Sequence, residues 1–300
     1  MRSFLIYIDY FSPVLIILAI DWRELGAITN VHSQGSCGAC WAITATETIE
    51  AVNYIATGVL RDLSESEIII CDDSCEMCDG GWPQNAYDYV IENNGLPAES
   101  SSSYDGSFLM TLTSVTSGES DELSENEINY IKETTCPANG YKGYSDRYGA
   151  IKGYAYATER CSCYTDGTGC DCDEQDEELA VLNIASYGPA TVCLEASTWQ
   201  DYTGGVITSD SGCSSAFLDM NHCVQIVGYA YTDVSDEAGE MENGSGSDDK
   251  NGGQSHREGY WIVRNQWSSY WGMNGYAYVA MGGNTCGILN DATQVFMNNH

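Results

Sequence analysis

The chain has 300 residues, of which 43% are hydrophobic, so it is long enough to bury one large core or two closely packed lobes. Its 11 Lys and Arg residues stand against 44 Asp and Glu residues, which gives a formal net charge of -33 at pH 7. This charge argues against nucleic acid or an anionic membrane as a partner, because the phosphates would repel the protein at long range.

The first twenty residues are mostly apolar, but Asp9 and Pro13 interrupt them. The unbroken apolar stretch 14–20 is far too short to span a bilayer. We expect residues 1–20 to be a degenerate signal peptide or a mis-joined N-terminus that precedes the folded domain.

Helical patterns dominate the first half of the chain. Apolar residues recur every three or four positions in 41–57, and Gly58 ends that pattern. Ser64 and Glu67 form a capping-box sequence that opens a second, shorter helix. A third helix is expected over 83–94, starting with a proline and followed by a glycine.

Strand patterns dominate the second half, after one more helix near 177–187. Short β-branched or aromatic runs occupy 190–195, 222–229, 260–266 and 276–281. A helix-rich half followed by a strand-rich half predicts an α+β fold with two lobes and a cleft between them.

Two inserts interrupt this pattern. Residues 232–258 are rich in Gly, Ser, Asp, Glu and Asn, so we expect an acidic, mobile surface loop. Residues 100–127 are rich in Ser and Glu and predict another excursion from the core.

The 14 cysteines are many for a cytosolic enzyme, and the chain is too long for a disulfide-stapled mini-protein. We therefore expect a protein of the lysosome or vacuole, or a secreted one, with several disulfide bridges. Reduced buried thiols together with a metal site are the alternative.

Cys40 is the candidate nucleophile, because it lies in the first turn of the helix predicted over 41–57. The helix dipole and free backbone N–H groups stabilise an anion at that position, which lowers the pKa of a thiol. From its position alone, half of a disulfide is an equally good interpretation of Cys40.

His222 is the candidate base by elimination among four histidines. His300 is the last residue, His256 lies in the acidic insert, and His32 is expected to be a solvated surface histidine. His222 opens an apolar strand that can hold its ring rigidly, although a histidine buried in the core also fits this pattern.

Asn265 follows the strand pattern that begins at Tyr260, and Trp267 comes two residues later. An amide oxygen close to a histidine accepts a hydrogen bond from one ring nitrogen and fixes the tautomer. Taken alone, Asn265 reads equally well as a turn residue at the end of a strand.

The stretch 34–41, Gln-Gly-Ser-Cys-Gly-Ala-Cys-Trp, resembles the active-site signature of the papain family of cysteine proteases. Further matches follow in the order of the family, at 21–23, 78–83, 221–222, 265–267 and 271–276. The resemblance therefore extends over 21–296 and implies a papain-like peptidase domain, with a mainly helical lobe at about 27–150 and a β-barrel-like lobe at about 151–296.

The resemblance implies four catalytic roles. Cys40 is the thiolate that attacks the scissile carbonyl, and His222 carries the proton to the leaving amine. Asn265 orients His222, and Gln34 donates its side-chain amide to the oxyanion, a contribution of roughly 3 kcal/mol. Cys37 is then a disulfide cysteine, and the implied pairs are Cys37–Cys78, Cys71–Cys136 and Cys213–Cys286.

The resemblance also implies the residues that contact substrate. They are Gly80, Gly81, Trp82, Pro83, Cys193, Cys223, Trp267 and Asp291. Asp291 matches the floor of the pocket for the second residue before the scissile bond, the P2 residue. We expect it to admit a basic side chain besides apolar ones, unless it points to solvent.

Cys193 and Cys223 form either a disulfide or two free thiols. Five further cysteines match no position to which the family pattern assigns a role. Cys161, Cys163, Cys170 and Cys172 bracket a turn, and we favour two nested bridges over a zinc knuckle. Cys75 has no evident partner.

We therefore predict a monomeric endopeptidase that acts on proteins or peptides, with no cofactor, metal or membrane partner. Propeptide-like or cystatin-like inhibitors are the partners that the resemblance implies, although the chain itself shows no propeptide sequence. The alternatives are a catalytically silent papain-like binding protein and, for the reaction, an exopeptidase.

Overall fold

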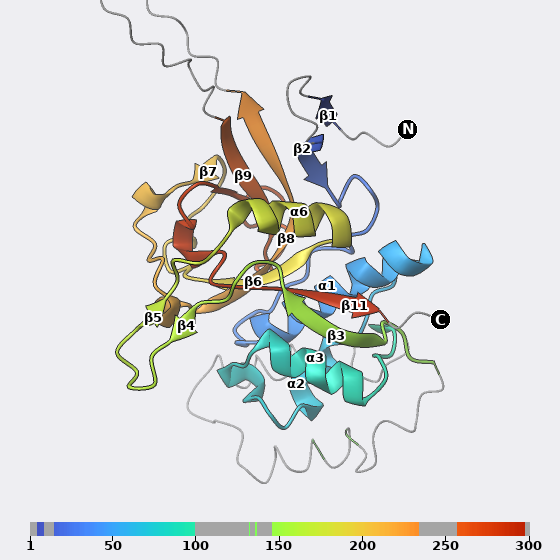
Figure 1. Ribbon diagram of the computed structural model, residues 1–300. Coiled ribbons are helices and arrows are strands. Elements are labelled where there is room, and N and C mark those ends of the chain that lie inside the picture. Colours follow the sequence, from blue (N-terminus) through green and yellow to red (C-terminus); the bar gives the residue numbers. More distant parts are fainter. Residues whose placement is uncertain are drawn as a thin grey trace, which may run out of the picture.

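The computed structural model describes residues 5–8, 15–99, 132, 136, 146–233 and 257–297 (Figure 1). The excursion expected at 100–127 lies entirely outside these residues. The loop expected at 232–258 also lies outside them, except for its two ends. Within the described ranges, no helix is both long and apolar enough to cross a membrane.

Three helices build the first lobe: α1 (Cys40–Thr57), α2 (Glu65–Cys71) and α3 (Pro83–Glu92). Helix α1 is buried along most of its length and ends at Gly58, whose positive φ of 74° suits a residue without a Cβ. The helix expected over 41–57 is confirmed, and α3 ends two residues before the expected position.

The predicted capping box of α2 is wrong. Ser64 occupies the N-cap position, but its side chain caps no helix N–H. Glu67 instead accepts hydrogen bonds from Arg147 Nη2 at 2.7 Å and from Tyr89 Oη at 3.0 Å. A buried carboxylate gains more from a guanidinium partner than from a backbone N–H at a helix end.

A large sheet builds the second lobe. Its strands are β1 (Leu5–Ile8), β2 (Leu15–Asp21), β3 (Ile151–Tyr156), β6 (Ala190–Leu194), β7 (Val206–Ile207), β8 (His222–Asp233), β9 (Arg257–Arg264), β10 (Tyr276–Ala280) and β11 (Asp291–Met297). The order is β3-β11-β6-β8-β9-β10-β7, with β2 paired to β8. Only the β10–β7 pair in this order is parallel.

Shorter elements complete the fold. Strands β4 (Ser162–Cys163) and β5 (Cys170–Asp171) form a separate hairpin that projects from the molecule, and α6 (Glu177–Tyr187) lies against β8 (Figure 1). The 3-10 turns are η1 (Met77–Asp79), η3 (Ser209–Ser211), η4 (Phe217–Asp219) and η5 (Thr285–Gly287). Helix α6 has the bounds that the sequence predicts.

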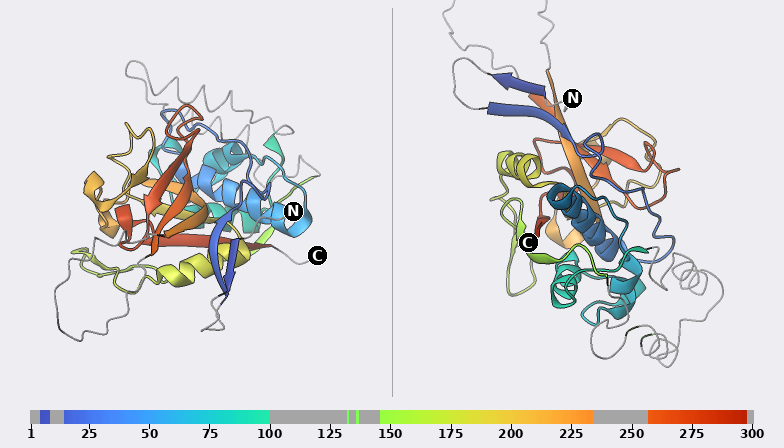
Figure 2. Two further views of the ribbon diagram at one scale, coloured as in Figure 1. Left: turned by 90° about the horizontal axis from the view of Figure 1, so that it is seen from above. Right: turned by 90° about the vertical axis from the view of Figure 1, so that its right-hand side faces the viewer.

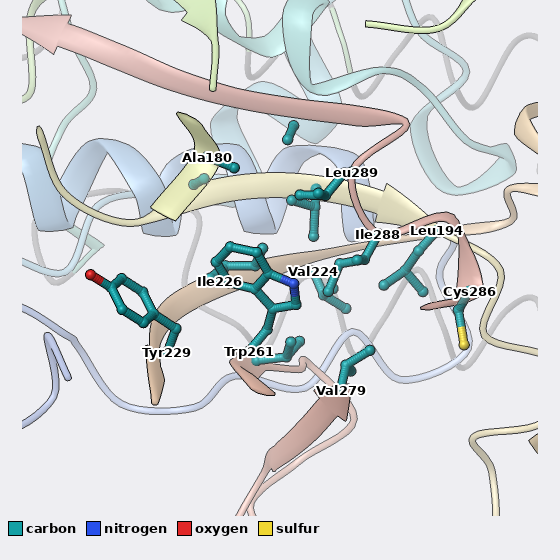
Figure 3. Close-up of a cluster of buried hydrophobic side chains, with 14 of the residues drawn as sticks. Ala180, Leu194, Val224, Ile226, Tyr229, Trp261, Val279, Cys286, Ile288 and Leu289 are labelled. Atoms are coloured by element: carbon teal, nitrogen blue, oxygen red, sulfur yellow. The ribbon is translucent and has the colours of Figure 1, made fainter. Parts of the chain in front are cut away.

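Two hydrophobic cores correspond to the two lobes. In the sheet lobe, Trp261 packs among Val224, Ile226 and Val279 (Figure 3). In the helical lobe, Trp41 lies in a core that α1, α2 and α3 share. Strands β3 and β11 add residues to the core of the helical lobe, and β2 pairs with β8 in the sheet lobe. A lobe boundary near residue 150 therefore stays a prediction.

Helix α1 lies between the other helices and strand β8 (Figure 2). Its Thr48 hydroxyl lies 2.7 Å from the hydroxyl of Thr191 on β6, and Thr191 also donates to the carbonyl of Thr44 at 3.0 Å. These buried hydrogen bonds fix the helix that begins with Cys40 against the strands of the other lobe.

Six disulfides cross-link the chain. They are Cys37–Cys78, Cys71–Cys136, Cys213–Cys286, Cys161–Cys172, Cys163–Cys170 and Cys193–Cys223. The first three are the pairs that the family resemblance implies. The next two are nested across the β4–β5 hairpin, so its four sulfurs are not available as zinc ligands.

Candidate active site

Cys40 is the first residue of α1 and is one of two free cysteines, the other being Cys75. It is therefore not the disulfide half that its position alone allowed. Burial raises the pKa of the Cys40 thiol, and hydrogen bonds from backbone N–H groups, foremost that of Cys223, oppose this rise. A thiolate at this position has backbone donors ready to stabilise it.

His222 is the first residue of β8 and is buried, with 6% of its surface exposed. Its Nε2 lies 2.8 Å from Oδ1 of Asn265, and its ring stacks on Trp267 with the centroids 4.9 Å apart. Burial lowers the pKa of His222 to about 4, although the bond to Asn265 acts in the opposite direction.

The tautomer of His222 follows from its neighbours. The backbone N–H of Gln266 donates to Oδ1 of Asn265 at 2.9 Å. A backbone N–H can only donate, so the Asn265 atom that it contacts has to be the amide oxygen. That oxygen can only accept, so Nε2 of His222 has to carry a proton and donate it to Asn265. Nδ1 of His222 is therefore the basic nitrogen of the neutral ring.

The side chain of Gln266 connects the start of α1 with the start of β8. The backbone N–H of Cys223, the residue after His222, also lowers the pKa of the Cys40 thiol. The side chain of Gln266 donates to the carbonyl of Cys223 at 2.7 Å and lies 3.4 Å from that of Cys40. Gln266 was not among the residues predicted for the site, although it lies between two of them, Asn265 and Trp267.

Gln34 lies in the loop before α1. Its backbone N–H donates to the carbonyl of Gln266 at 2.9 Å, and its side-chain Nε2 donates to the carbonyl of Cys37 at 2.7 Å. Gly38 allows this loop to close, because a Cβ there would lie 2.5 Å from the carbonyl oxygen of Cys78. The Cys37–Cys78 disulfide fastens the same contact.

The residues expected to contact substrate gather next to this site. Cys193 and Cys223 are opposite each other in the β6–β8 register and form a disulfide. Asp291 is opposite Cys193 in the β11–β6 register. A Cβ on Gly81 would lie 2.6 Å from a ring atom of Trp41, so this segment requires glycine where it passes the helix.

Trp82 follows Gly81 and is 42% exposed. Its ring stacks on Phe217, which belongs to η4 of the other lobe, with 6.2 Å between the centroids and 13° between the planes. Pro83 begins α3 and is buried. The aromatic pair Trp82–Phe217 thus bridges the two lobes.

Asp291 does not point to solvent, so that alternative is wrong. Its side chain is 1% exposed, and its two oxygens accept hydrogen bonds from Gln84 Nε2 at 2.6 Å and Arg160 Nε at 2.9 Å. No sequence pattern predicted a role for Arg160. Its position directly before Cys161, the first of the hairpin cysteines, was the only local sign.

His32 is not a solvated surface residue, and that expectation is wrong. Its Nδ1 lies 3.0 Å from Glu65 and its Nε2 lies 3.3 Å from Asp62. Burial alone would lower the pKa of His32, but the nearby carboxylates outweigh it and raise the pKa to about 12. His32 is thus part of a buried ion cluster and lies apart from the base of the site.

The sequence profile described as papain family cysteine protease matches residues 17–296. The chain belongs to the papain family of cysteine proteases. Fruit bromelain of Ananas comosus is 30% identical over 90% of this chain and 58% of its own length. Cathepsin O of Homo sapiens is 29% identical over 93% of this chain and 66% of its own length. The chain thus spans about two thirds or less of these relatives.

A solved structure of the bromelain protease from Ananas comosus in complex with the E64 inhibitor shares the fold. Its TM-score is 0.61 at 25% identity, with 94% of this chain and 100% of that chain covered. The expected α+β fold with two papain-like lobes is therefore confirmed.

Proposed function

We propose that this papain-family protein is a cysteine endopeptidase in which Cys40 is the nucleophile and His222 the base. The observation that carries the proposal is the fixed tautomer of His222, together with the side chain of Gln266, which bonds the carbonyls of both the free Cys40 and the residue after His222. Nε2 of His222 is committed to Asn265, so Nδ1 is the atom that accepts a proton.

Burial favours the neutral form of Cys40 and of His222 when each is considered alone, because a lone charge is costly in this environment. Transfer of the proton from Sγ of Cys40 to Nδ1 of His222 creates both charges together, and their attraction offsets the cost. The thiolate and the imidazolium therefore form as a pair.

In the proposed reaction, the Cys40 thiolate forms a bond to the carbonyl carbon, and the carbonyl electrons move to its oxygen. The backbone N–H of Cys40 and the side chain of Gln34 donate to that oxyanion. An amide group carries two N–H donors, so the bond from Gln34 to Cys37 leaves one for this purpose.

When the tetrahedral intermediate collapses, the C–N bond breaks and the proton on Nδ1 of His222 passes to the leaving amine. Water then adds to the thioester and gives its proton to Nδ1. The C–S bond then breaks and releases the acid, and the proton on Nδ1 returns to the sulfur of Cys40, so the protein is unchanged over the cycle.

The test is hydrolysis of a panel of fluorogenic peptides between pH 4 and 8 by the wild type, Cys40→Ala and Cys75→Ala proteins. Cys75 is the matched control, because it is the second free cysteine. We expect activity in the wild type and Cys75→Ala, and its loss in Cys40→Ala. Activity that survives Cys40→Ala would refute the proposal.

E64 gives a second readout, because the related bromelain structure contains this inhibitor. Folded protein that hydrolyses no peptide and does not react with E64 at Cys40 would favour the alternative, a silent binding protein. Cleavage positions in a long unblocked peptide distinguish an endopeptidase, which cuts internally, from an exopeptidase, which releases terminal units only.

The six disulfides support a secreted protein or one of the lysosome or vacuole, because such bridges persist in oxidising compartments. Location of the tagged protein in cells, by fractionation against marker enzymes, tests this part. Recovery in the cytosol would contradict it.

A further inference from the structure

Arg160 is held in place from both sides. It directly precedes Cys161, which the Cys161–Cys172 disulfide ties to the end of the β4–β5 hairpin. The backbone N–H of Cys161 also donates to the carbonyl of Asn290 at 3.2 Å. Arg160 is thus anchored next to the residue that precedes Asp291, just before the hairpin that begins with β4.

Both oxygens of Asp291 already accept hydrogen bonds within the protein. Its carboxylate is buried, one oxygen accepts from Gln84 and the other from Arg160. A basic side chain of a substrate would have to displace the guanidinium of Arg160 from a partner that is already desolvated. The charge expected to attract basic P2 residues is therefore neutralised within the protein itself.

The rest of the guanidinium faces the aromatic bridge between the lobes. Its central carbon lies 5.2 Å from the ring of Phe217, 5.9 Å from that of Trp82 and 5.8 Å from that of Tyr156. The side chain of Arg160 is 38% exposed. Only its Nε bonds to Asp291, and its Nη atoms donate no hydrogen bond to any described residue.

We propose that Arg160 is a specificity-determining residue: it blocks basic P2 side chains and offers its Nη donors to P2 side chains that end in an oxygen acceptor, glutamine or glutamate. The proposal rests on the proposed function for the location of the P2 pocket. Guanidinium and oxygen acceptors form charge-assisted hydrogen bonds, and aromatic faces restrain the guanidinium for that contact.

The test uses Cys40→Ala protein, so that binding is measured without turnover. Four blocked peptides that differ only in P2 carry Gln, Glu, Leu or Arg, and calorimetry gives their dissociation constants. We expect the Gln and Glu peptides to bind about tenfold or more tighter than the Arg peptide. Tighter binding of the Arg peptide would overturn the proposal.

Removing Arg160 should invert this preference. In Cys40→Ala/Arg160→Gln, Asp291 becomes available, so the Arg peptide should gain about tenfold or more relative to the Gln peptide. Adding Asp291→Asn should abolish that gain. Arg61→Gln is the matched control, because it removes one arginine elsewhere, where Arg61 stacks on Tyr148. An unchanged order of affinities in Arg160→Gln would also overturn the proposal.

Arg160→Lys tests the same idea if Arg160→Gln does not fold. A lysine keeps the positive charge beside Asp291 but lacks the second arm of the guanidinium. The Lys variant should therefore still reject the Arg peptide and lose the advantage of the Gln and Glu peptides. A Lys variant with the affinities of the parent would contradict a role for the Nη donors.

Turnover is measured separately with Cys40 present and the Leu peptide as substrate. Peptides that bind with the expected preference but are never cleaved would refute the peptidase proposal and leave the role of Arg160 intact. Cleavage with a P2 preference that does not respond to Arg160→Gln would refute only the role of Arg160.

Discussion

His222 and Asn265 are joined by one contact of 2.8 Å, and the direction of this hydrogen bond is determined: His222 Nε2 donates to Asn265 Oδ1. In Asn265→Ala the ring loses the acceptor that selects its tautomer. We expect kcat to fall by roughly tenfold to a hundredfold with little change in KM, because the effect is on the reacting geometry.

Steady-state kinetics on a fluorogenic peptide measure this loss. Asn85→Ala is the matched control, since Asn85 is a partly exposed asparagine that bonds to Ser74. Equal kcat values for wild type and Asn265→Ala would contradict the assigned role.

Formation of the thiolate together with the imidazolium predicts how Cys40 reacts with iodoacetamide. At pH 6 the wild type should be alkylated readily, and His222→Ala should react about a hundredfold more slowly, because without the imidazolium the effect of burial outweighs the backbone donors and keeps the pKa of the thiol raised. The Cys75→Ala background leaves one free thiol for mass spectrometry. Equal rates in the two proteins would show that Cys40 ionises independently of His222.

The buried ion cluster around His32 predicts that stability falls as the pH rises. Burial raises the pKa of Glu47 to about 7 and that of Glu50 to about 8, despite the attraction of Arg264. Above pH 4.5 the unfolded chain releases these protons and the folded protein retains them. Each retained proton lowers the free energy of unfolding by about 1.4 kcal/mol per pH unit until the folded pKa is reached.

Above pH 6.5 His32 also lowers the free energy of unfolding as the pH rises, since its pKa is raised in the folded protein. Below pH 6.5 His222 has the opposite effect on the free energy of unfolding, since its pKa is lowered. Urea unfolding at pH 5, 6.5 and 8 should therefore give decreasing stability. Glu47→Gln should show a shallower decrease, because one of the retained protons is removed. Stability that rises between pH 6.5 and 8 would contradict this assignment.

Gly38 predicts a steric effect on the loop before α1. In Gly38→Ala the new methyl group would meet the backbone carbonyl of Cys78. The Cys37–Cys78 disulfide holds this carbonyl close to the loop, so the clash cannot be relieved by a shift of Cys78 alone. We expect a loss of about 1–3 kcal/mol in stability and a lower kcat. Gly153→Ala is the control, because a Cβ at Gly153 meets no atom within 4 Å. Thermal unfolding and peptide kinetics would show whether the two variants differ.

Sequence patterns and family motifs predicted that His222 and Asn265 lie together, and their 2.8 Å contact agrees with this, while the catalytic roles of Cys40, His222 and Asn265 stay predictions. Cys40, His222 and Asn265 each open or close a regular element, so their local patterns and the family motifs pointed to the same positions. The register of β6 and β8 then determines that Cys193 and Cys223 face each other, which spacing along the chain left open.

Two tertiary contacts were beyond the reach of sequence patterns. Arg160 and Asp291 meet because the segment after β3 continues beside the start of β11, with the backbone N–H of Ala157 and of Cys161 donating to the carbonyls of Ala292 and Asn290, and no periodicity relates positions so far apart. His32 was interpreted from its loop, but its environment is made by Glu65 and Asp62, which come from another part of the chain. Composition around a histidine in sequence does not report the charges around it in space.

The hydroxyl contact between Thr48 and Thr191 has a consequence for how a protein would be cut. Both groups are buried, and any hinge that opened the lobes would leave them without partners, at a cost of about 1–3 kcal/mol each. Under the proposed function, the lobes therefore keep their arrangement, and a protein substrate has to change shape at the site. A folded protein substrate would then be cleaved where a segment of its chain unfolds easily into an extended conformation.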